Sequence, residues 1–278
     1  MTNLSPELRT PYAFEAILHA SGGGEIARLE AQNRLLETTR PLDHLPPLPE
    51  AGRILDVGSG TGYWTLRLAS RVPRGQVVCL DRSPELLALA RARLEEAGLA
   101  AQYLHQDLRE LRLEPEAFDL IFTSVTLAHV EELEAVLSHL TAALKPGGWL
   151  AGFEPAQGNG RLFELHPPCP ALETLVHRMA AVLVEKGSDL GVGLKLAHHL
   201  DRLGLEDVTM RSFGEAVHGE HLHTWIQEIF IPLVQTWLAA RLDPLELDRL
   251  LATALEETAQ TYVWADLRRT VILGRKPL

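Results

Sequence analysis

The spacing of apolar residues changes along the chain near residue 53. Before it, Ile26, Leu29 and Leu36 recur at near-helical spacing and predict a helix within residues 24–39. After it, helical segments alternate with five short apolar runs, which predict strands at 54–57, 76–81, 101–105, 118–123 and 149–154. Strands that alternate with helices indicate an α/β fold with a parallel, doubly wound sheet.

Beyond residue 155 the pattern becomes mostly helical, with two further strand patterns at 205–213 and 266–275. The sequence therefore predicts a seven-stranded, mostly parallel sheet. We expect a helical arm at 1–49, an α/β domain at 50–278, and within it a helical insertion at about 214–262 that forms a lid. Local signals agree: Ser83 and Pro84 are typical of a helix start, and Gly98 of a helix end.

Composition places the chain among ordinary globular proteins, with 46% hydrophobic and 23% charged residues among 278. No apolar run reaches the roughly 20 residues of a membrane span. The first ten residues lack the basic and apolar segments of a signal peptide, so we expect a cytoplasmic protein. Nothing in the sequence indicates an oligomeric state.

Charge and cysteine content narrow the classes of function. The net charge of −11 disfavours a nucleic acid substrate, because phosphate binding needs a basic surface. The two cysteines, Cys79 and Cys169, are too few for a disulfide framework or a structural zinc site.

A glycine-rich loop, Asp56-Val57-Gly58-Ser59-Gly60-Thr61-Gly62, follows the first predicted strand and opens a helix. Glycines let a ligand approach the backbone closely, and the free N–H groups at a helix start attract negative charge. The alternative is a tight turn without a ligand. Asp81 ends the second strand, where an acid accepts hydrogen bonds from ribose hydroxyls; the alternative there is a helix-capping aspartate.

The segment ILDVGSGTG resembles the first motif of class I methyltransferases, which use S-adenosylmethionine. The segments QVVCLDRS, LHQDLREL, FDLIFTSVTLAHV and LKPGGWLAGFEP resemble the later motifs of that family, in the right order over about residues 50–155. The resemblance implies a Rossmann-like fold, S-adenosylmethionine as cofactor, and methyl transfer by in-line displacement.

The resemblance also implies roles for individual residues. The methionine part of the cofactor would lie near Asp56, Gly58, Ser59, Gly60 and the Thr123 carbonyl. Asp81 would hold the ribose and Arg82 would lie along the adenine. Asp107 would accept from the adenine amino group, with the Leu108 N–H nearby, and Ser124 and Val125 would line the path to the acceptor.

The N-terminal helix resembles one found in several small-molecule methyltransferases. Arg28 and Gln32 share a helix face that would close over the cofactor carboxylate, or form a solvated surface pair. On the acceptor side, His129 is the first candidate for a general base and Glu154 the second, for substrate contact or base. The alternatives are a packing histidine and a simple strand-end acid.

Two groups of residues in the helical insertion are candidate sites. His218, Glu220, His221 and His223 could hold a metal, but their spacing favours a solvated or lid-lining cluster, so we predict no metal site. The second group consists of apolar and aromatic residues that could line an acceptor pocket or, alternatively, form the core of the lid itself. They are Trp225, Ile226, Phe230, Trp237 and Tyr262.

The leading hypothesis is a methyltransferase with a small-molecule acceptor. A catalytically silent module that binds the cofactor is the second, and a protein or RNA methyltransferase the third. A nicotinamide-dependent oxidoreductase is the weakest, since no lysine or tyrosine for hydride transfer has an obvious place.

Overall fold

The computed structural model describes residues 24–158, 162–259 and 263–278. By contact, the chain forms two compact units. The helical unit comprises the described residues of Met1–Thr39, Gln157–Gly191 and Phe213–Arg269. The sheet unit comprises Arg40–Ala156, Val192–Ser212 and Thr270–Leu278.

This division differs from the boundaries expected from the sequence. The helix α2 (Gly24–Glu37) belongs to the same unit as the helices of the insertion, rather than to a separate arm. Residues 157–191 also belong to that unit. The strands β7 (Glu206–His218) and β8 (Trp264–Arg275) each contribute residues to both units.

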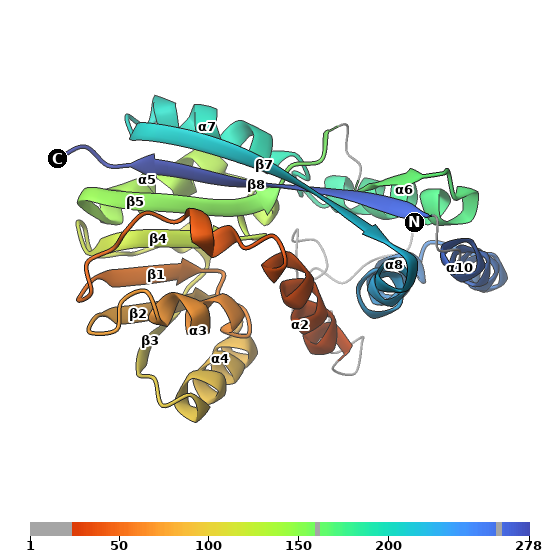
Figure 1. Cartoon of the computed structure of the whole chain (residues 1–278), viewed down its shortest axis with the longest axis horizontal. Coiled ribbons are helices and arrows are strands. Elements are labelled where there is room, and N and C mark those ends of the chain that lie inside the picture. The colour runs from red at the N-terminus through yellow and green to blue at the C-terminus, as the bar shows by residue number, and fades with distance from the viewer. Residues whose placement is uncertain (1–23, 159–161, 260–262) are drawn as a thin grey trace. The chain divides into compact units, whose positions relative to one another are not determined.

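The sheet unit contains the five strands predicted after residue 53 (Figure 1). They are β1 (Arg53–Val57), β2 (Gln76–Asp81), β3 (Ala101–His105), β4 (Phe118–Ser124) and β5 (Leu144–Pro155). The strand order is β3-β2-β1-β4-β5-β8, and β7 pairs with β8. The pairings among β1 to β5 are all parallel. The order reverses between β1 and β4, and ligands bind outside the carboxyl ends of strands at such a point.

Helices cover both faces of this sheet, which confirms the doubly wound prediction. Val78 and Leu80 of β2 lie in a core with α5 (Leu133–Ala143) and α7 (Val192–Arg202). Cys79, between them, packs with α4 (Pro84–Glu96) instead. Successive side chains of a strand point to opposite faces, so both faces of the sheet are buried.

The local signals at α4 are also confirmed. The Ser83 hydroxyl accepts a hydrogen bond of 3.2 Å from the Leu86 N–H, and Pro84 is the first helical residue. After the helix, Gly98 takes a positive φ of 71°, which a residue with a Cβ adopts with strain. Residues 145–148, which read Lys-Pro-Gly-Gly, lie inside β5, beside a shift of register against β4.

The helical unit contains the predicted insertion together with α2 and residues 157–191. Its other helical segments are α6 (Pro170–Glu185), α8 (Gly219–Trp225), the π-helix η6 (Ile226–Phe230), α9 (Ile231–Leu238) and α10 (Pro244–Thr258). Within this unit α2 packs on η6, where Arg34 lies 3.6 Å from Glu228. A three-residue strand, β6 (Glu164–His166), pairs antiparallel with β8 and is the eighth strand, where seven were expected.

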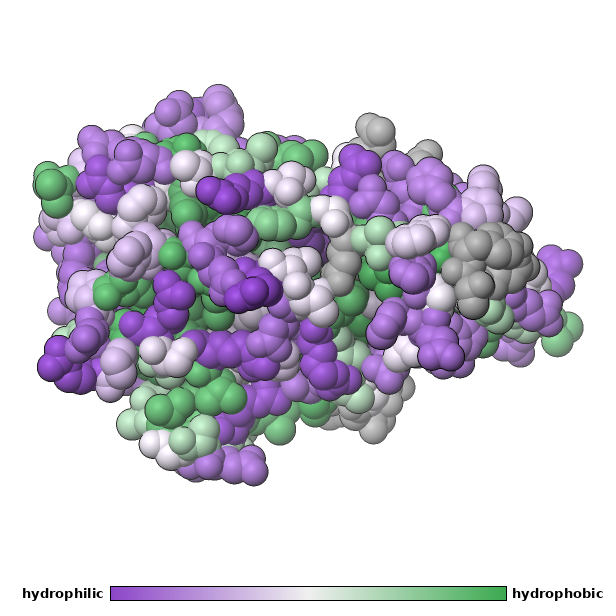
Figure 2. Space-filling model, in the orientation of Figure 1, coloured by the Kyte–Doolittle hydropathy of each residue, from purple (hydrophilic) through white to green (hydrophobic). Residues whose placement is uncertain are grey.

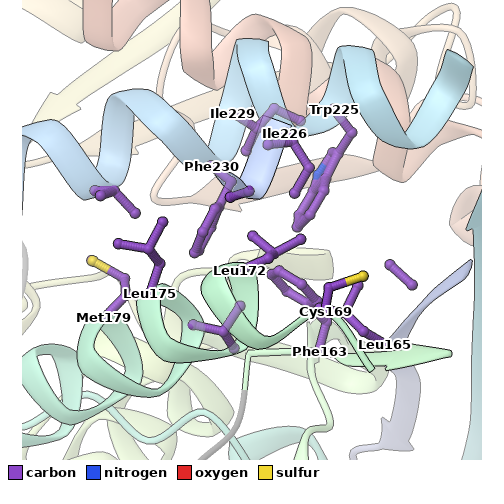
Figure 3. Close-up of a cluster of buried hydrophobic side chains, with 14 of the residues drawn as sticks. Phe163, Leu165, Cys169, Leu172, Leu175, Met179, Trp225, Ile226, Ile229 and Phe230 are labelled. Carbon is purple, nitrogen blue, oxygen red and sulfur yellow. The ribbon is translucent and has the colours of Figure 1, made fainter. Parts of the chain in front are cut away.

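Aromatic side chains form the centre of the helical unit (Figure 3). The Phe163 ring meets Trp225 at 4.7 Å and Phe230 at 5.4 Å between centroids, both edge-on. Trp225, Ile226, Phe230 and Trp237 are all buried in this core. The structure therefore supports the alternative that these residues form the unit's own core; Tyr262 lies outside the described residues.

Each unit holds one buried thiol. Cys79 lies in the sheet unit and Cys169 in the core of the helical unit. Burial raises the pKa of Cys79 to about 12 and that of Cys169 to about 11, so both are protonated thiols near neutral pH.

Hydrophilic and hydrophobic residues are mixed over the face of the molecule shown in Figure 2. Among the described residues, large apolar side chains are well exposed at a few positions, such as Leu245 at 79%. None of the described helices has the length and apolar character that a membrane crossing requires.

Candidate functional site

The glycine loop lies at the carboxyl end of β1 and is hydrogen-bonded to the end of β2. The Gly58 and Ser59 N–H groups both donate to the Leu80 carbonyl oxygen, at 2.8 and 3.0 Å. Gly58, Gly60 and Gly62 have φ values of 67°, 53° and 74°. Only glycine adopts this region without strain. The loop then leads directly into α3 (Tyr63–Ala69), as the sequence pattern predicts.

Asp81 lies beside this loop. One carboxylate oxygen accepts from the Gly60 N–H at 2.9 Å, and the other accepts from the Ser83 N–H at 2.9 Å. Asp81 is therefore buried and held by the loop at the end of β2.

Two observations show that the loop suits a polar ligand. A Cβ built at Gly60 would meet only the Gly58 carbonyl oxygen, 4.0 Å away, so the loop faces open space there. The Ser59 hydroxyl oxygen is buried and has no hydrogen-bond partner among the described residues. A buried hydroxyl at Ser59 and open space at the neighbouring Gly60 fit the binding of a ligand with polar groups.

Asp56 is buried behind the loop. Its carboxylate accepts from the Thr65 hydroxyl at 2.5 Å, which joins β1 to α3. Burial, with the nearby Asp81 charge as a smaller cause, raises the Asp56 pKa from 3.8 to about 7. Thr65 carried no signal in the sequence, because a threonine inside a helix is common.

The next strand end carries Asp107. Asp81 and His105 are paired in register, so Asp107 follows close to the end of β2. Both Asp107 oxygens accept from the Arg109 side chain, at 3.0 and 2.7 Å, and these bonds lower the Asp107 pKa. The predicted bond to an adenine amino group would share this carboxylate with Arg109. Leu108 begins the short helix η3 (Leu108–Glu110).

Arg82 supports the same region from the end of β2. Its guanidinium has one buried nitrogen without a hydrogen-bond partner among the described residues. Its charge also helps to lower the pKa of Asp107. The Arg82 carbonyl oxygen lies 2.9 Å from Nε2 of His105 at the end of β3, and the contact of Arg82 with an adenine stays a prediction.

Glu154 is fully buried at the end of β5. Its Oε1 accepts from the Thr123 hydroxyl at 2.9 Å and from the Thr126 and Leu127 N–H groups at 3.2 and 3.1 Å. Its Oε2 accepts from the Ala128 N–H at 3.4 Å. The carboxylate therefore caps the short helix η4 (Leu127–His129), which the sequence did not indicate.

Two residues that follow β4 have conformations or contacts that no sequence pattern predicted. Val125 has a φ of 50°, a region that a β-branched residue rarely adopts. Thr126 has its side chain against Gly58, since a Cβ on Gly58 would lie 2.3 Å from the Thr126 hydroxyl oxygen. Neither role has a sequence signal, because both depend on contacts between strands far apart in the chain.

The remaining candidates are distributed over both units. His129 is the last residue of η4 in the sheet unit and is half-buried, with its N–H on the Thr126 carbonyl. Arg28 lies in the helical unit, where it is buried and donates to Glu25 at 2.8 Å and to Gln32 at 2.8 Å. The alternative of a solvated surface pair is therefore wrong for Arg28.

The histidines of the insertion have other neighbours. The His218 ring lies 4.0 Å from the Trp264 ring, and His223 Nδ1 lies 3.5 Å from the Thr258 hydroxyl. Over residues 24–158, 162–259 and 263–278, no group of three or more His, Cys, Asp or Glu side chains could hold a metal ion.

The raised pKa of Glu154 predicts how stability depends on pH. Burial raises this pKa from 4.5 to about 7, so the protonated form stabilises the fold. This contribution is full below pH 4.5 and is lost as the pH rises through 7, by about 3 kcal/mol. Glu154→Gln cannot ionise, so its free energy of unfolding should lack this fall. Urea unfolding of both proteins from pH 5 to 8 checks this, and parallel curves would contradict it.

A family model described as "Methyltransferase domain" matches residues 54–148. The chain is 41% identical over 118 residues to a trans-aconitate 2-methyltransferase of Variovorax paradoxus, covering 41% of this chain and 44% of that protein. It is 29% identical over 197 residues to a demethylmenaquinone methyltransferase of Bacillus cytotoxicus, covering 67% of this chain and 81% of that protein. The chain thus spans less than half the length of the first of these relatives.

Among solved structures, the fold is similar to that of a Haemonchus contortus phosphoethanolamine N-methyltransferase in complex with S-adenosylhomocysteine. The TM-score is 0.58 at 19% identity, covering 94% of this chain and 58% of that one. The strand order, the glycine loop and the family match agree. They identify residues 54–148 as a class I methyltransferase domain of the S-adenosylmethionine-dependent type.

Proposed function

We propose that this protein binds S-adenosylmethionine and transfers its methyl group to a small-molecule acceptor. The observation that carries the proposal is the bond between the Gly60 N–H and Asp81. It joins the glycine loop to a carboxylate at the carboxyl ends of adjacent parallel strands, where ligands of such sheets bind. The methyltransferase relatives, which include enzymes named for small acceptors, support it.

Each site residue has a role under this proposal. Asp81 accepts from the ribose hydroxyls, and Asp107 and the Leu108 N–H meet the adenine, with Arg82 along its face. The loop at Gly58–Gly60, which faces open space at Gly60, and the Thr123 carbonyl receive the methionine part, and Asp56 holds the loop to α3 through Thr65. The contact predicted for Arg28 and Gln32 with the cofactor carboxylate stays a prediction.

The chemistry needs little from the protein beyond positioning. S-adenosylmethionine, when bound, supplies a methyl group already activated on a sulfonium. Holding the reactants in line can lower the barrier by up to roughly 7–11 kcal/mol. His129 would take a proton only if the acceptor atom carries one, such as a hydroxyl. The cytoplasmic location also stays a prediction.

Calorimetry of S-adenosylmethionine and S-adenosylhomocysteine binding, with NAD as the control, tests the proposal. We expect micromolar binding of at least one adenosyl ligand and none of NAD. Binding without methylation of a broad panel of carboxylate, hydroxyl and amine acceptors would favour the silent binding module. Absence of binding by either adenosyl ligand would overturn the proposal.

A further inference from the structure

The buried carboxylate of Glu154 is bonded to a single stretch of chain. Its four donors are one hydroxyl and three N–H groups, and all four lie in residues 123–128. The exposed fraction of Glu154 is 0%, so no acceptor molecule reaches this carboxylate in the structure described. These contacts indicate that Glu154 holds residues 123–128 in place and does not contact the methyl acceptor directly.

The stretch held by Glu154 contains a strained residue. Val125 has a φ of 50°, and its N–H donates to the Phe153 carbonyl at 2.9 Å. Strained residues persist only where the surroundings hold them on several sides. Here β5 holds the stretch twice, through the Phe153 carbonyl and through the Glu154 side chain.

Thr126 carries this constraint to the glycine loop. Its N–H donates to Glu154, while its hydroxyl lies 3.2 Å from the Val57 carbonyl oxygen. The same side chain fills the space next to Gly58, where a Cβ would come within 2.3 Å of the hydroxyl oxygen. Glu154, Thr126 and Gly58 are thus in successive contact.

We propose that Glu154 is a positioning residue, which holds Thr126 against Gly58 and thereby fixes the shape of the glycine loop that binds the cofactor. This proposal rests on the proposed function, since the loop is assigned to S-adenosylmethionine. Under this proposal, Glu154 acts on the binding of the methyl donor, S-adenosylmethionine, rather than on the methyl acceptor. It also gives Thr126, which has no predicted role, a part in cofactor binding.

The chemistry of the four bonds defines the variants. Glutamine keeps the shape of Glu154, but its NH₂ group cannot accept, so one side of the amide would face a donor. Thr126→Val keeps the shape of Thr126 and removes the hydroxyl, whereas Thr126→Ser keeps the hydroxyl. Glu257→Gln is the matched control, because Glu257 accepts from the Ala171 and Leu172 N–H groups at 3.0 Å and so caps α6 in the helical unit.

The experiment measures S-adenosylhomocysteine binding by calorimetry at pH 8, with thermal unfolding beside it. We expect Glu154→Gln to weaken binding about tenfold, as loss of a hydrogen bond to a charged group does. Thr126→Val should weaken binding about fivefold, because its hydroxyl donates to the neutral Val57 carbonyl. Thr126→Ser should stay within about twofold of the unchanged protein. Glu257→Gln should lower the unfolding temperature and leave binding unchanged.

The double variant Glu154→Gln/Thr126→Val tests whether the two residues act through one contact. We expect it to bind no more weakly than the weaker single variant, since coupled residues are not additive. Folded variants that bind as tightly as the unchanged protein would overturn the inference and leave the proposed function intact. If the unchanged protein binds no S-adenosylhomocysteine, the proposed function fails first.

Discussion

Replacing Gly58 with alanine should lower the free energy of unfolding by about 2–5 kcal/mol and weaken S-adenosylhomocysteine binding at least about tenfold. The positive φ of 67° strains any residue with a Cβ. The new methyl group would also lie 2.3 Å from the hydroxyl oxygen of Thr126 and 2.6 Å from its Cγ2. Either the loop or Thr126 must then move. Urea unfolding and calorimetry measure the two effects.

Gly98 provides the matched control for this experiment. Its φ of 71° is nearly the same, yet a Cβ there would meet nothing within 4 Å. Gly98→Ala should therefore lose only about 1–2 kcal/mol of stability and bind normally. The double variant Gly58→Ala/Thr126→Ala removes the two nearest atoms and should recover part of the stability. Equal losses for Gly58→Ala and Gly98→Ala would show that the contact with Thr126 is unimportant.

Asp81→Ala should weaken S-adenosylhomocysteine binding by at least about a hundredfold. The variant loses the acceptor for two ribose hydroxyls under the proposed function. It also releases the Gly60 and Ser83 N–H groups that the carboxylate holds at 2.9 Å. Calorimetry with the ligand gives the change in affinity.

Asp119→Ala is the control for the loss of a carboxylate in the same unit. Asp119 accepts from the Arg53 N–H and from Lys145, both at 2.7 Å, and lies near the start of β4 rather than its carboxyl end. Its loss should reduce stability without changing affinity. Binding by Asp81→Ala within about threefold of the unchanged protein would exclude Asp81 from the cofactor site.

The strands of the sheet unit were predictable because each is a short apolar run bounded by turn residues. The α4 start was predictable because Ser83 caps it through local bonds. The strand β6 was missed because three residues are too few to show an alternating pattern. The grouping of α2 with the later helices depends on contacts such as Arg34–Glu228, which sequence periodicity cannot reveal.

The features of the candidate site also divide into those that local sequence patterns predict and those that depend on contacts between distant residues. The glycine loop and Asp81 follow from a motif with fixed spacing, and the structure brings them into contact. The surroundings of Glu154 could not be predicted, because its four donors come from a different strand and turn. The aromatic residues of the insertion have helical spacing, which indicates burial but does not tell a core from a pocket.

The placement of one buried cysteine in each unit has a practical consequence. A thiol reacts with alkylating or disulfide reagents as the thiolate, and both thiols are kept protonated and out of solvent. Modification therefore requires local or global opening of the unit around each cysteine. The rate at Cys79 reports opening of the sheet unit and the rate at Cys169 that of the helical unit. Peptide mapping after timed labelling would thus tell, in the unaltered protein, which unit a bound ligand protects.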